Sequence, residues 1–309
     1  MPKQLESVHI GFLGLGNMGG PMAARLVTAG ATVRGFDPAV EARRGLAAQG
    51  GTPVESNTDL ADSDLLILML PGSAVVESVL IGDGLAERLA PGTLVIDMSS
   101  SEPLRTRELA ARLAERDIRL IDAPVSGGVT GALRGTLTIM VGGSDKDVAA
   151  ANPILTALGT PKHVGPIAAG HALKALNNLL SATHLWVTSE AILAGEEFGL
   201  DPSTMLEAIN GSSGRSGSSE NKWPNFIIPG GYNSGFSLRL MLKDMHIATD
   251  LARSLSVPIS LGEAAVAEWE RAAEALEPTA DHTEIARFLE SEVGTNAPES
   301  ATLATPSSS

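Results

Sequence analysis

The chain of 309 residues contains no cysteine, and aromatic residues make up only 3% of it. Without cysteine there are no disulfides, no thiolate metal ligands and no cysteine nucleophile. Such a composition suits a reducing compartment. Hydrophobic residues still make up 43% of the chain, which is enough at this length for two domains with sizeable cores.

Positive charge is also scarce. Lysine and arginine number 22 against 36 aspartates and glutamates, so the formal net charge is −14. The acids are spread along the chain and no basic block occurs. A nucleic-acid partner needs a basic surface, and an anionic membrane surface would repel this chain. We therefore expect neither partner.

Long apolar runs are missing as well. No stretch approaches the roughly 18 apolar residues of a membrane span, and no apolar leader or Arg/Ser-rich presequence precedes the first predicted strand. We therefore expect a cytoplasmic protein. The six histidines include no pair at i, i+4 spacing, so we expect no metal site.

A glycine-rich turn near the start of the chain is the most informative feature that is present. Residues 8–13 read as an apolar strand, and Gly14, Gly16 and Gly19 then form a G-x-G-x-x-G pattern before an Ala/Leu-rich helix over 18–29. In a dinucleotide-binding turn these glycines allow the sharp exit, the approach of the pyrophosphate and close helix packing. The alternative is a glycine turn without a ligand.

Asp37 supports the dinucleotide interpretation. It ends a second predicted strand that starts at Thr32, about 20 residues beyond the glycines, where a carboxylate accepts hydrogen bonds from a ribose 2′-hydroxyl. Because a carboxylate repels a 2′-phosphate, we expect NAD to be preferred over NADP. Asp37 could instead be an ordinary turn residue. Three nearby arginines leave NADP possible: Arg34, Arg43 and Arg44.

Up to about residue 165, short apolar runs alternate with helical segments. The further strand candidates are 65–70, 94–98, 118–122 and 137–141. This alternation predicts an α/β fold with a doubly wound, mostly parallel Rossmann-type sheet over residues 1–165. Ligands of such sheets bind beyond the carboxyl ends of the strands. We therefore expect the loops that follow these strands to carry the chemistry.

Beyond residue 165 the pattern is helical. A helix over 168–198 would be roughly 45 Å long at 1.5 Å rise per residue, which is long enough to bridge two domains. Asp201 and Pro202 then form a helix start. Further helices are predicted at 238–255, 260–276 and 281–289. We expect an all-α domain over 166–291 with a Ser/Gly-rich loop at 211–223, and a disordered tail over 292–309.

Two stretches carry polar groups where simple packing would not place them. Ser126, Gly127 and Gly128 follow a predicted strand and offer a hydroxyl with closely spaced N–H donors, which suits a small carboxylate. Lys174 and Asn178 are four residues apart, so their side chains lie on one helix face. A lysine partly removed from water there can act as an acid–base catalyst. The alternatives are an ordinary turn and a solvated lysine.

Together these features resemble the β-hydroxyacid dehydrogenase family, typified by 3-hydroxyisobutyrate dehydrogenase and tartronate semialdehyde reductase, over residues 8–290. The family pattern G-F-I-G-L-G-x-M-G-x-P-M-A is matched from Gly11 to Ala23, and D-A-P-V-S-G-G over 122–128. The catalytic pattern G-x-x-G-x-G-x-x-x-K-x-x-N-N aligns over 165–178. This chain departs from it at Ala168, where relatives usually have glycine, and at His171, where glutamine is frequent.

The resemblance implies an NAD-dependent oxidoreductase that interconverts a small 3-hydroxy acid and its 3-oxo acid or semialdehyde, and a homodimer or homotetramer. It implies that Lys174 is the catalytic acid–base, that Asn178 contacts the substrate, and that Ser126 and Gly127, with Gly128 beside them, bind the substrate carboxylate. The cofactor-binding positions it implies are Gly14, Leu15, Gly16, Asn17, Met18, Gly19, Asp37, Leu70, Pro71, Ser100 and Lys243.

Several alternatives stay open at this point. The imine-reducing branch of the same superfamily usually lacks the lysine that stands here at 174. A non-catalytic NAD-binding protein could retain the fold. His171 could touch the substrate or only pack. Arg215 or Lys222 could meet a second anionic group of the substrate, or be solvated loop cations.

Overall fold

The computed structural model describes residues 5–6 and 8–293. The chain divides into two compact units, one of residues 1–177 with 247–258 and one of 178–246 with 259–309. Two helices, α8 (Ala169–Phe198) and α10 (Leu238–Ser254), therefore contribute residues to both units. Within the described residues, no helix combines the length and the apolar character that a membrane span requires.

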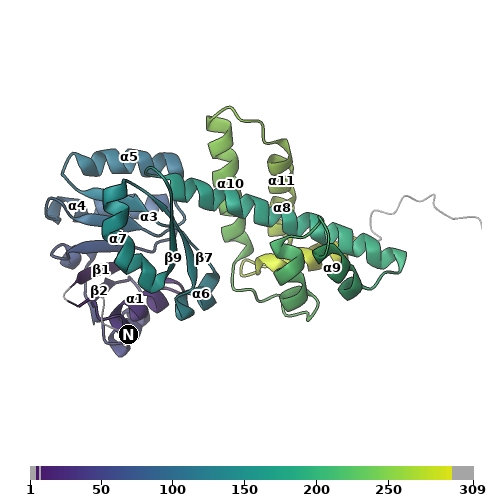
Figure 1. Ribbon diagram of the computed structural model, residues 1–309, viewed down its shortest axis with the longest axis horizontal. Coiled ribbons are helices and arrows are strands. Elements are labelled where there is room, and N and C mark those ends of the chain that lie inside the picture. Colours follow the sequence, from purple (N-terminus) through teal and green to yellow (C-terminus); the bar gives the residue numbers. More distant parts are fainter. Residues whose placement is uncertain (1–4, 7, 294–309) are drawn as a thin grey trace, which may run out of the picture. The chain divides into compact units, whose positions relative to one another are not determined.

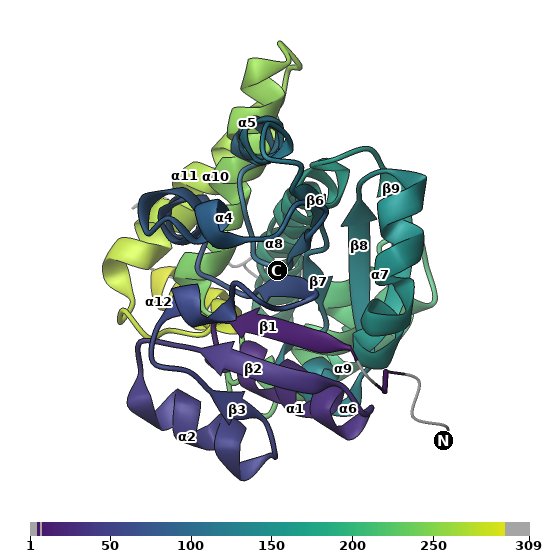
Figure 2. The same cartoon turned by 90° about the vertical axis from the view of Figure 1, so that its left-hand side faces the viewer.

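The first unit is built on a nine-stranded sheet with the order β3-β2-β1-β4-β5-β6-β8-β7 and with β9 beside β8. The predicted doubly wound sheet is confirmed: neighbours from β3 to β6 are parallel, and β8 runs antiparallel to β6 and β7 (Figure 2). The strands are β1 (His9–Leu13), β2 (Thr32–Phe36), β3 (Thr52–Pro53), β4 (Leu65–Leu68), β5 (Leu94–Asp97), β6 (Arg119–Asp122), β7 (Val125–Ser126), β8 (Leu137–Gly142) and β9 (Gly159–Gly165).

Three of these strands were not predicted. β3 and β7 have two residues each, which is too short for a periodic pattern. β9 is polar, carries Pro161 and pairs only with β8 among the described strands. Proline is tolerated at a sheet edge because the strand there needs to donate to one neighbour only.

Helices cover both faces of this sheet (Figure 1). Leu65 and Ile67 of β4 belong to one apolar cluster, and Leu66 and Leu68 belong to the other. Because alternate residues of a strand face opposite sides, this explains the unbroken apolar run of β4. The helical segments are α1 (Gly19–Thr28), α2 (Val40–Ala48), η1 (Asn57–Leu60), α3 (Ser73–Glu77), η2 (Ser78–Gly82), α4 (Leu85–Arg88), α5 (Pro103–Ala114), α6 (Gly128–Arg134) and α7 (Asp145–Leu158).

The second unit is helical, as predicted. The Asp201 side chain caps α9 by accepting the N–H of Thr204 at 2.8 Å, which confirms the predicted helix start. Trp269 is fully buried, and Trp186 packs on Phe288 with ring centroids 6.1 Å apart. Besides its parts of α8 and α10, the unit contains α9 (Pro202–Asn210), η3 (Ser218–Ile227), α11 (Ser260–Ala275), η4 (His282–Glu284) and α12 (Ile285–Glu292).

The loop predicted over 211–223 is wrong from Ser218 onward, where the π-helical segment η3 begins. The N–H of Ser216 donates to the Ser219 hydroxyl at 2.9 Å, and the N–H of Ser219 returns a bond to the Ser216 hydroxyl at 3.3 Å. Trp223 is buried behind this turn. The serines that resemble a flexible linker in composition therefore act as a helix cap.

The C-terminal predictions need two smaller corrections. The helix predicted over 281–289 starts as the 3₁₀ turn η4, and α12 then continues to Glu292. Residues 294–309 of the expected disordered tail lie outside the described residues.

The start of α8 contains a backbone exception. Ala168 has a φ of +74°, in the left-handed region, and its side chain is buried. Glycine adopts this conformation without the steric penalty that a Cβ atom brings, which is of the order of 1–2 kcal/mol. The departure from glycine at this position thus places strain directly before the helix that carries Lys174.

We expect Ala168→Gly to relieve this strain. A glycine in a regular helix costs about 0.5–1 kcal/mol relative to alanine, so Ala172→Gly in the same helix is the matched control. The free energy of unfolding from urea denaturation should be higher for Ala168→Gly than for Ala172→Gly by about 1 kcal/mol or more. Equal losses in the two variants would show that Ala168 is not strained.

Candidate functional site

The glycine-rich turn between β1 and α1 has the geometry that a dinucleotide requires. Gly14 has a φ of +89°, and a Cβ atom on Gly19 would lie 1.8 Å from the carbonyl oxygen of Gly14. A Cβ atom on Gly16, in contrast, would meet no atom within 4 Å. The side of the turn at Gly16 is therefore open, as the approach of a pyrophosphate needs. The turn fits the dinucleotide.

A hollow of about 1140 Å³ borders this turn at Leu15, Gly16 and Asn17 and continues along α1 and α2. Met18 follows as the residue before α1. The predicted cofactor residues of the turn are thus together at the carboxyl end of β1, where ligands of doubly wound sheets bind.

Asp37 lies at the end of β2 and joins this turn. One carboxylate oxygen accepts the N–H of Leu15 and the other accepts the N–H of Ala39, each at 2.8 Å. A carboxylate has about four acceptor sites, so these two bonds leave capacity for ribose hydroxyls. The N–H of Leu15 therefore already donates its hydrogen bond to a side chain of the protein, Asp37.

The loop after β5 is organised by Asp97, which sequence reasoning missed. Asp97 is 1% exposed and accepts the N–H of Ser99 and the hydroxyl of Ser101, both at 2.9 Å. Ser100 lies between these two anchored residues. The Ser99 hydroxyl in turn accepts the N–H of Leu70 at 3.0 Å, so the loops that carry Ser100 and Leu70-Pro71 are connected. A buried acid before three serines is the signal that could have revealed Asp97.

The segment Ser126-Gly127-Gly128 leads from β7 into α6. Ser126 pairs with Thr138 of β8, and the chain then turns through a φ of +126° at Gly127 and +61° at Gly128. A Cβ atom on Gly128 would meet nothing within 4 Å. The positive φ angles explain the glycines, and the open space agrees with the predicted carboxylate cradle.

Asp122 connects the end of β6 to the start of α8. Its carboxylate is fully buried and accepts the N–H of Ala168 at 2.6 Å and the N–H of His171 at 2.7 Å. Burial raises the pKa of this carboxyl, while the nearby His171 and the two N–H donors act in the opposite direction. Asp122 was predicted only as part of a motif, and the structure shows it as the N-terminal cap of this helix.

His171 packs among these buried groups. Its side chain is 0% exposed, its Nδ1 lies 2.9 Å from the Thr106 hydroxyl, and its Nε2 lies 3.8 Å from the Asp97 carboxylate. Nε2 has no hydrogen-bond partner among the described residues. This environment favours the packing interpretation of His171 over contact with the substrate.

Lys174 and Asn178 are buried on α8, at 9% and 5% exposure. The burial of Lys174 excludes the alternative of a solvated surface lysine. Asn178 donates from its amide nitrogen to the Asp244 carboxylate of α10 at 2.7 Å, and Lys243 forms an ion pair with the same carboxylate at 3.4 Å. Asp244, which sequence reasoning did not select, therefore fixes the orientation of the Asn178 amide.

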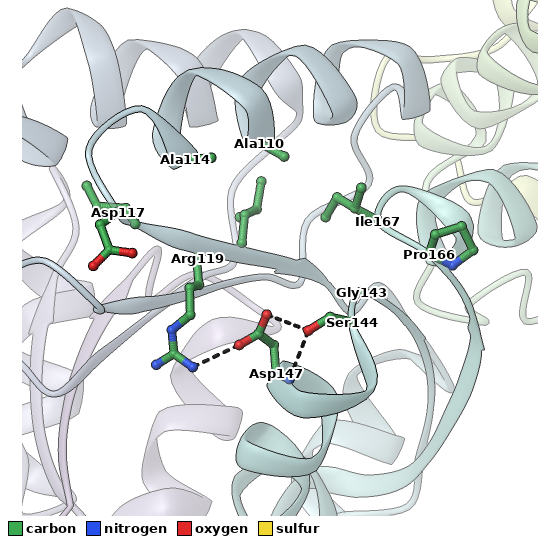
Figure 3. Close-up of a pocket in the computed structure, with 11 residues that line it drawn as sticks. Ala110, Ala114, Asp117, Arg119, Gly143, Ser144, Asp147, Pro166 and Ile167 are labelled. Carbon is green, nitrogen blue, oxygen red and sulfur yellow. Dashed lines mark hydrogen bonds and ion pairs between the residues drawn. The ribbon is translucent and has the colours of Figure 1, made fainter.

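A separate pocket of about 460 Å³ contains none of the predicted site residues (Figure 3). Its apolar part includes Ala110, Ala114 and Ile167. Its arginine, Arg119, donates to Asp147 at 2.8 Å and also to the carbonyl of Gly92. The charge of Arg119 is thus already paired within the pocket.

Comparison with known proteins agrees with this arrangement. Residues 9–172 match the NAD-binding domain of 6-phosphogluconate dehydrogenase, and residues 168–289 match the NAD-binding domain of NADP-dependent 3-hydroxyisobutyrate dehydrogenase. The chain belongs to the β-hydroxyacid dehydrogenase family. As a member of this family it is an oxidoreductase that uses NAD or NADP and acts on 3-hydroxy acids.

Individual relatives support the family assignment. The chain is 40% identical over 259 residues to 2-(hydroxymethyl)glutarate dehydrogenase of Eubacterium barkeri, a match that covers 83% of this chain and 86% of the relative. It is also 40% identical to 3-hydroxyisobutyrate dehydrogenase of Pseudomonas aeruginosa, over 82% of this chain and 88% of the relative. The solved structure of Mycobacterium tuberculosis 3-hydroxyisobutyrate dehydrogenase with L-serine has a TM-score of 0.86 at 34% identity, covering 91% of this chain and 99% of that one.

In this β-hydroxyacid dehydrogenase, we expect Asp122→Asn to lower the free energy of unfolding. An asparagine retains one acceptor oxygen but turns its amide group toward the second N–H, so one buried donor loses its partner. The loss should be about 2–3 kcal/mol by urea denaturation. The control is Asp250→Asn, whose exposed carboxylate pairs with nearby Arg253 and whose loss should stay within about 0.5 kcal/mol. Similar values for the two variants would contradict the capping role.

Proposed function

We propose that this enzyme transfers a hydride reversibly between NAD and the carbinol carbon of a small 3-hydroxy acid, giving the 3-oxo acid or semialdehyde. The observation that carries the proposal is the burial of Lys174, one helical turn before Asn178, within the segment that matches the 3-hydroxyisobutyrate dehydrogenase model. A lysine removed from bulk water is suited to exchange a proton with a substrate hydroxyl.

In the oxidation, Lys174 acts as a neutral amine. It takes the hydroxyl proton while the C–H bond of the carbinol carbon breaks and the C=O bond forms. The bound nicotinamide supplies the hydride acceptor. In the reduction, the Lys174 ammonium returns the proton to the oxygen. The oxidation thus converts the alcohol into the carbonyl compound: the hydride of the C–H bond goes to the bound nicotinamide, and the proton of the O–H bond goes to Lys174.

Asn178 and the 126–128 segment position the substrate. The Asn178 amide, oriented by its bond to Asp244, directs the substrate oxygen toward Lys174 on the same helix face. The Ser126 hydroxyl and the N–H of Gly127 hold the substrate carboxylate, and the open space at Gly128 admits it. Fixing both ends of a small acid places its carbinol carbon for transfer.

The cofactor would be held at the carboxyl edge of the sheet. The residues proposed for this are the turn from Gly14 to Gly19, Asp37, Leu70-Pro71 and Ser100, and the family resemblance adds Lys243 of α10. Asp37 supports NAD over NADP, because its carboxylate at the end of β2 would repel a 2′-phosphate.

The residues proposed above for catalysis and carboxylate binding do not determine which side chain the substrate carries. The two curated relatives are named for a hydroxy monoacid and for a hydroxy diacid, and the solved relative was captured with L-serine. All three molecules share a hydroxymethyl group next to the carbon that bears the carboxylate. We propose that the substrate of this chain has the same reacting end.

A homodimer or homotetramer remains part of the proposal. In the second unit, α8 leaves Leu180 and Val187 58% and 52% exposed at a seven-residue spacing, which places them on one face. Light scattering of the purified protein tests this expectation.

We expect Lys174→Ala to lower kcat for a 3-hydroxy acid by about 10²-fold or more, since general acid–base catalysis contributes 10²- to 10⁴-fold. The assay is NADH formation across a panel of 3-hydroxyisobutyrate, 3-hydroxypropionate, glycerate, serine and 2-(hydroxymethyl)glutarate. NADH binding, followed by fluorescence, should be unchanged. Lys146→Ala, at an exposed lysine of α7, is the control and should keep wild-type kcat.

Two results would overturn this mechanism. An unchanged kcat in Lys174→Ala would remove the lysine from the proton transfer. A wild-type enzyme that binds NADH but oxidises no member of the panel would favour imine reduction or a non-catalytic binding role.

We expect Asp37→Asn to shift the cofactor preference toward NADP. The substitution removes the charge that repels the 2′-phosphate and keeps one acceptor oxygen for the turn. The ratio of kcat/KM for NAD to that for NADP should fall by about 10-fold, which corresponds to about 1.4 kcal/mol. Asp59→Asn, on η1, is the control, because it also removes a carboxylate and should leave the ratio at the wild-type value. An unchanged ratio in Asp37→Asn would assign Asp37 to the turn alone.

A further inference from the structure

Lys222 occupies an unusual position in the second unit. It lies on η3, its side chain is only partly exposed, and its ammonium nitrogen donates to the Ser181 hydroxyl of α8 at 2.8 Å. Burial lowers the pKa of Lys222 to about 8, and the charge of Asp281 opposes this shift. The predicted alternative of a solvated loop cation is therefore wrong for Lys222.

Within residues 5–6 and 8–293, the ammonium has no direct counter-ion. No carboxylate oxygen of the described residues lies within the 4.0 Å of an ion pair from it. Asp281, the acid whose charge acts on it, already accepts hydrogen bonds from Thr283, Ser234 and the N–H of Gly235. Its neighbour His282 is kept neutral, because burial lowers its pKa to about 4. A partly desolvated cation held by one neutral hydroxyl is unfavourable unless a ligand pairs with it.

Ser181 places this cation relative to the proposed site. It follows Asn178 by three residues on α8, so the two side chains lie on one helix face, slightly less than one turn or about 4.5 Å apart along the axis. Lys222 thus lies beside the same face, one turn beyond the amide that is proposed to orient the reacting oxygen.

We propose that Lys222 and Ser181 form a subsite for a second anionic group of the substrate, a carboxylate or sulfonate at the end opposite the reacting hydroxymethyl group. This inference rests on the proposed function, because it takes Asn178 as the reference for the reacting oxygen. The ammonium has two further N–H donors beside the one given to Ser181, and the serine hydroxyl can also rotate toward the anion.

Two acids that share the reacting end can distinguish an effect on this subsite from an effect on the hydride and proton transfer. 2-(Hydroxymethyl)glutarate and 3-hydroxyisobutyrate both carry a hydroxymethyl group and a carboxylate on one carbon, and only the first has a second carboxylate. We expect Lys222→Met to lower kcat/KM for the diacid by about 10²-fold, as for the loss of a partly buried charge pair, and to change kcat/KM for the monoacid less than about 3-fold.

Arg215→Gln is the matched control. Arg215 lies in the segment that precedes η3, its side chain is 62% exposed, and it pairs with Glu220. The ratio of the two kcat/KM values should stay at the wild-type value in this variant. A loss of diacid preference in Arg215→Gln in place of Lys222→Met would move the subsite to Arg215.

The pH dependence provides a second readout. Only the ammonium form of Lys222 binds an anion, so the diacid-to-monoacid ratio of kcat/KM should fall as the pH rises through about 8. Asp281 and His282 are the titratable groups whose charges are coupled to Lys222, and neither changes its charge near that pH when His282 titrates near 4. In Lys222→Met the ratio should be independent of pH between 7 and 9. A pH-dependent ratio in this variant would contradict the assignment.

Thermal unfolding distinguishes a ligand-binding role of Lys222 from a structural one. Glutarate should raise the Tm of the wild type more than butyrate does, and this difference should vanish in Lys222→Met. Without ligand, the variant should have the same Tm as the wild type or a higher one, because it lacks a partly buried charge. A lower Tm with an unchanged diacid preference would make Lys222 a structural residue.

The subsite inference and the proposed function would be overturned by different results. If the wild type oxidises 3-hydroxyisobutyrate through Lys174 but has no preference for the diacid, the subsite inference fails and the proposed function stands. If no 3-hydroxy acid is oxidised, the proposed function fails first.

Discussion

The carboxylate of Asp122 is the constraint on which the first unit depends. It ends the strand β6 and accepts the N–H of Ala168, directly before α8, and the N–H of His171 in the first turn of that helix. Because a helix is rigid over a few turns, fixing its first turn also fixes Lys174, which follows on the same helix. The loops that carry the glycine turn, Leu70 and Ser100 leave the carboxyl ends of neighbouring parallel strands. One buried hydrogen-bonding acid thus positions the proposed catalytic lysine relative to the carboxyl edge of the sheet, where the cofactor is proposed to bind.

The same region shows how buried acids are tolerated. Asp97 is 1% exposed and Asp122 is fully buried. Asp97 accepts hydrogen bonds from the segment that follows its own strand, whereas Asp122 accepts two N–H groups at the start of α8. His171 lies between them, at 3.8 Å and 4.0 Å from the two carboxylates. Buried carboxylates are costly when unpaired, so each one must organise a loop or a helix start around itself. Here that requirement determines the shape of the cofactor edge and the start of α8.

The sequence predicts local features well and distant pairings poorly. The glycine turn, the buried run of β4 and the Lys174–Asn178 spacing depend on φ angles and periodicities within one segment, so they can be read directly. Asp244 is 66 residues from Asn178, and Asp122 is 46 from Ala168, so only the folded chain reveals these bonds. The serines over 216–219 were misassigned because composition does not distinguish a linker from a cap whose hydroxyls bond to the next turn.

Along α8, the residues proposed for catalysis differ from those proposed for specificity. Lys174 and Asn178 are proposed to act on the reacting end of the substrate, and Ser181 continues the same face by about one turn. The cation proposed for that position, Lys222, comes from η3, whose start is held by hydrogen bonds between Ser216 and Ser219 and whose Trp223 is buried. Under the proposed roles, substitutions at 222 change which group is recognised without disturbing the proton transfer. The proposal thus accounts for one helix in relatives that are named for both a monoacid and a diacid.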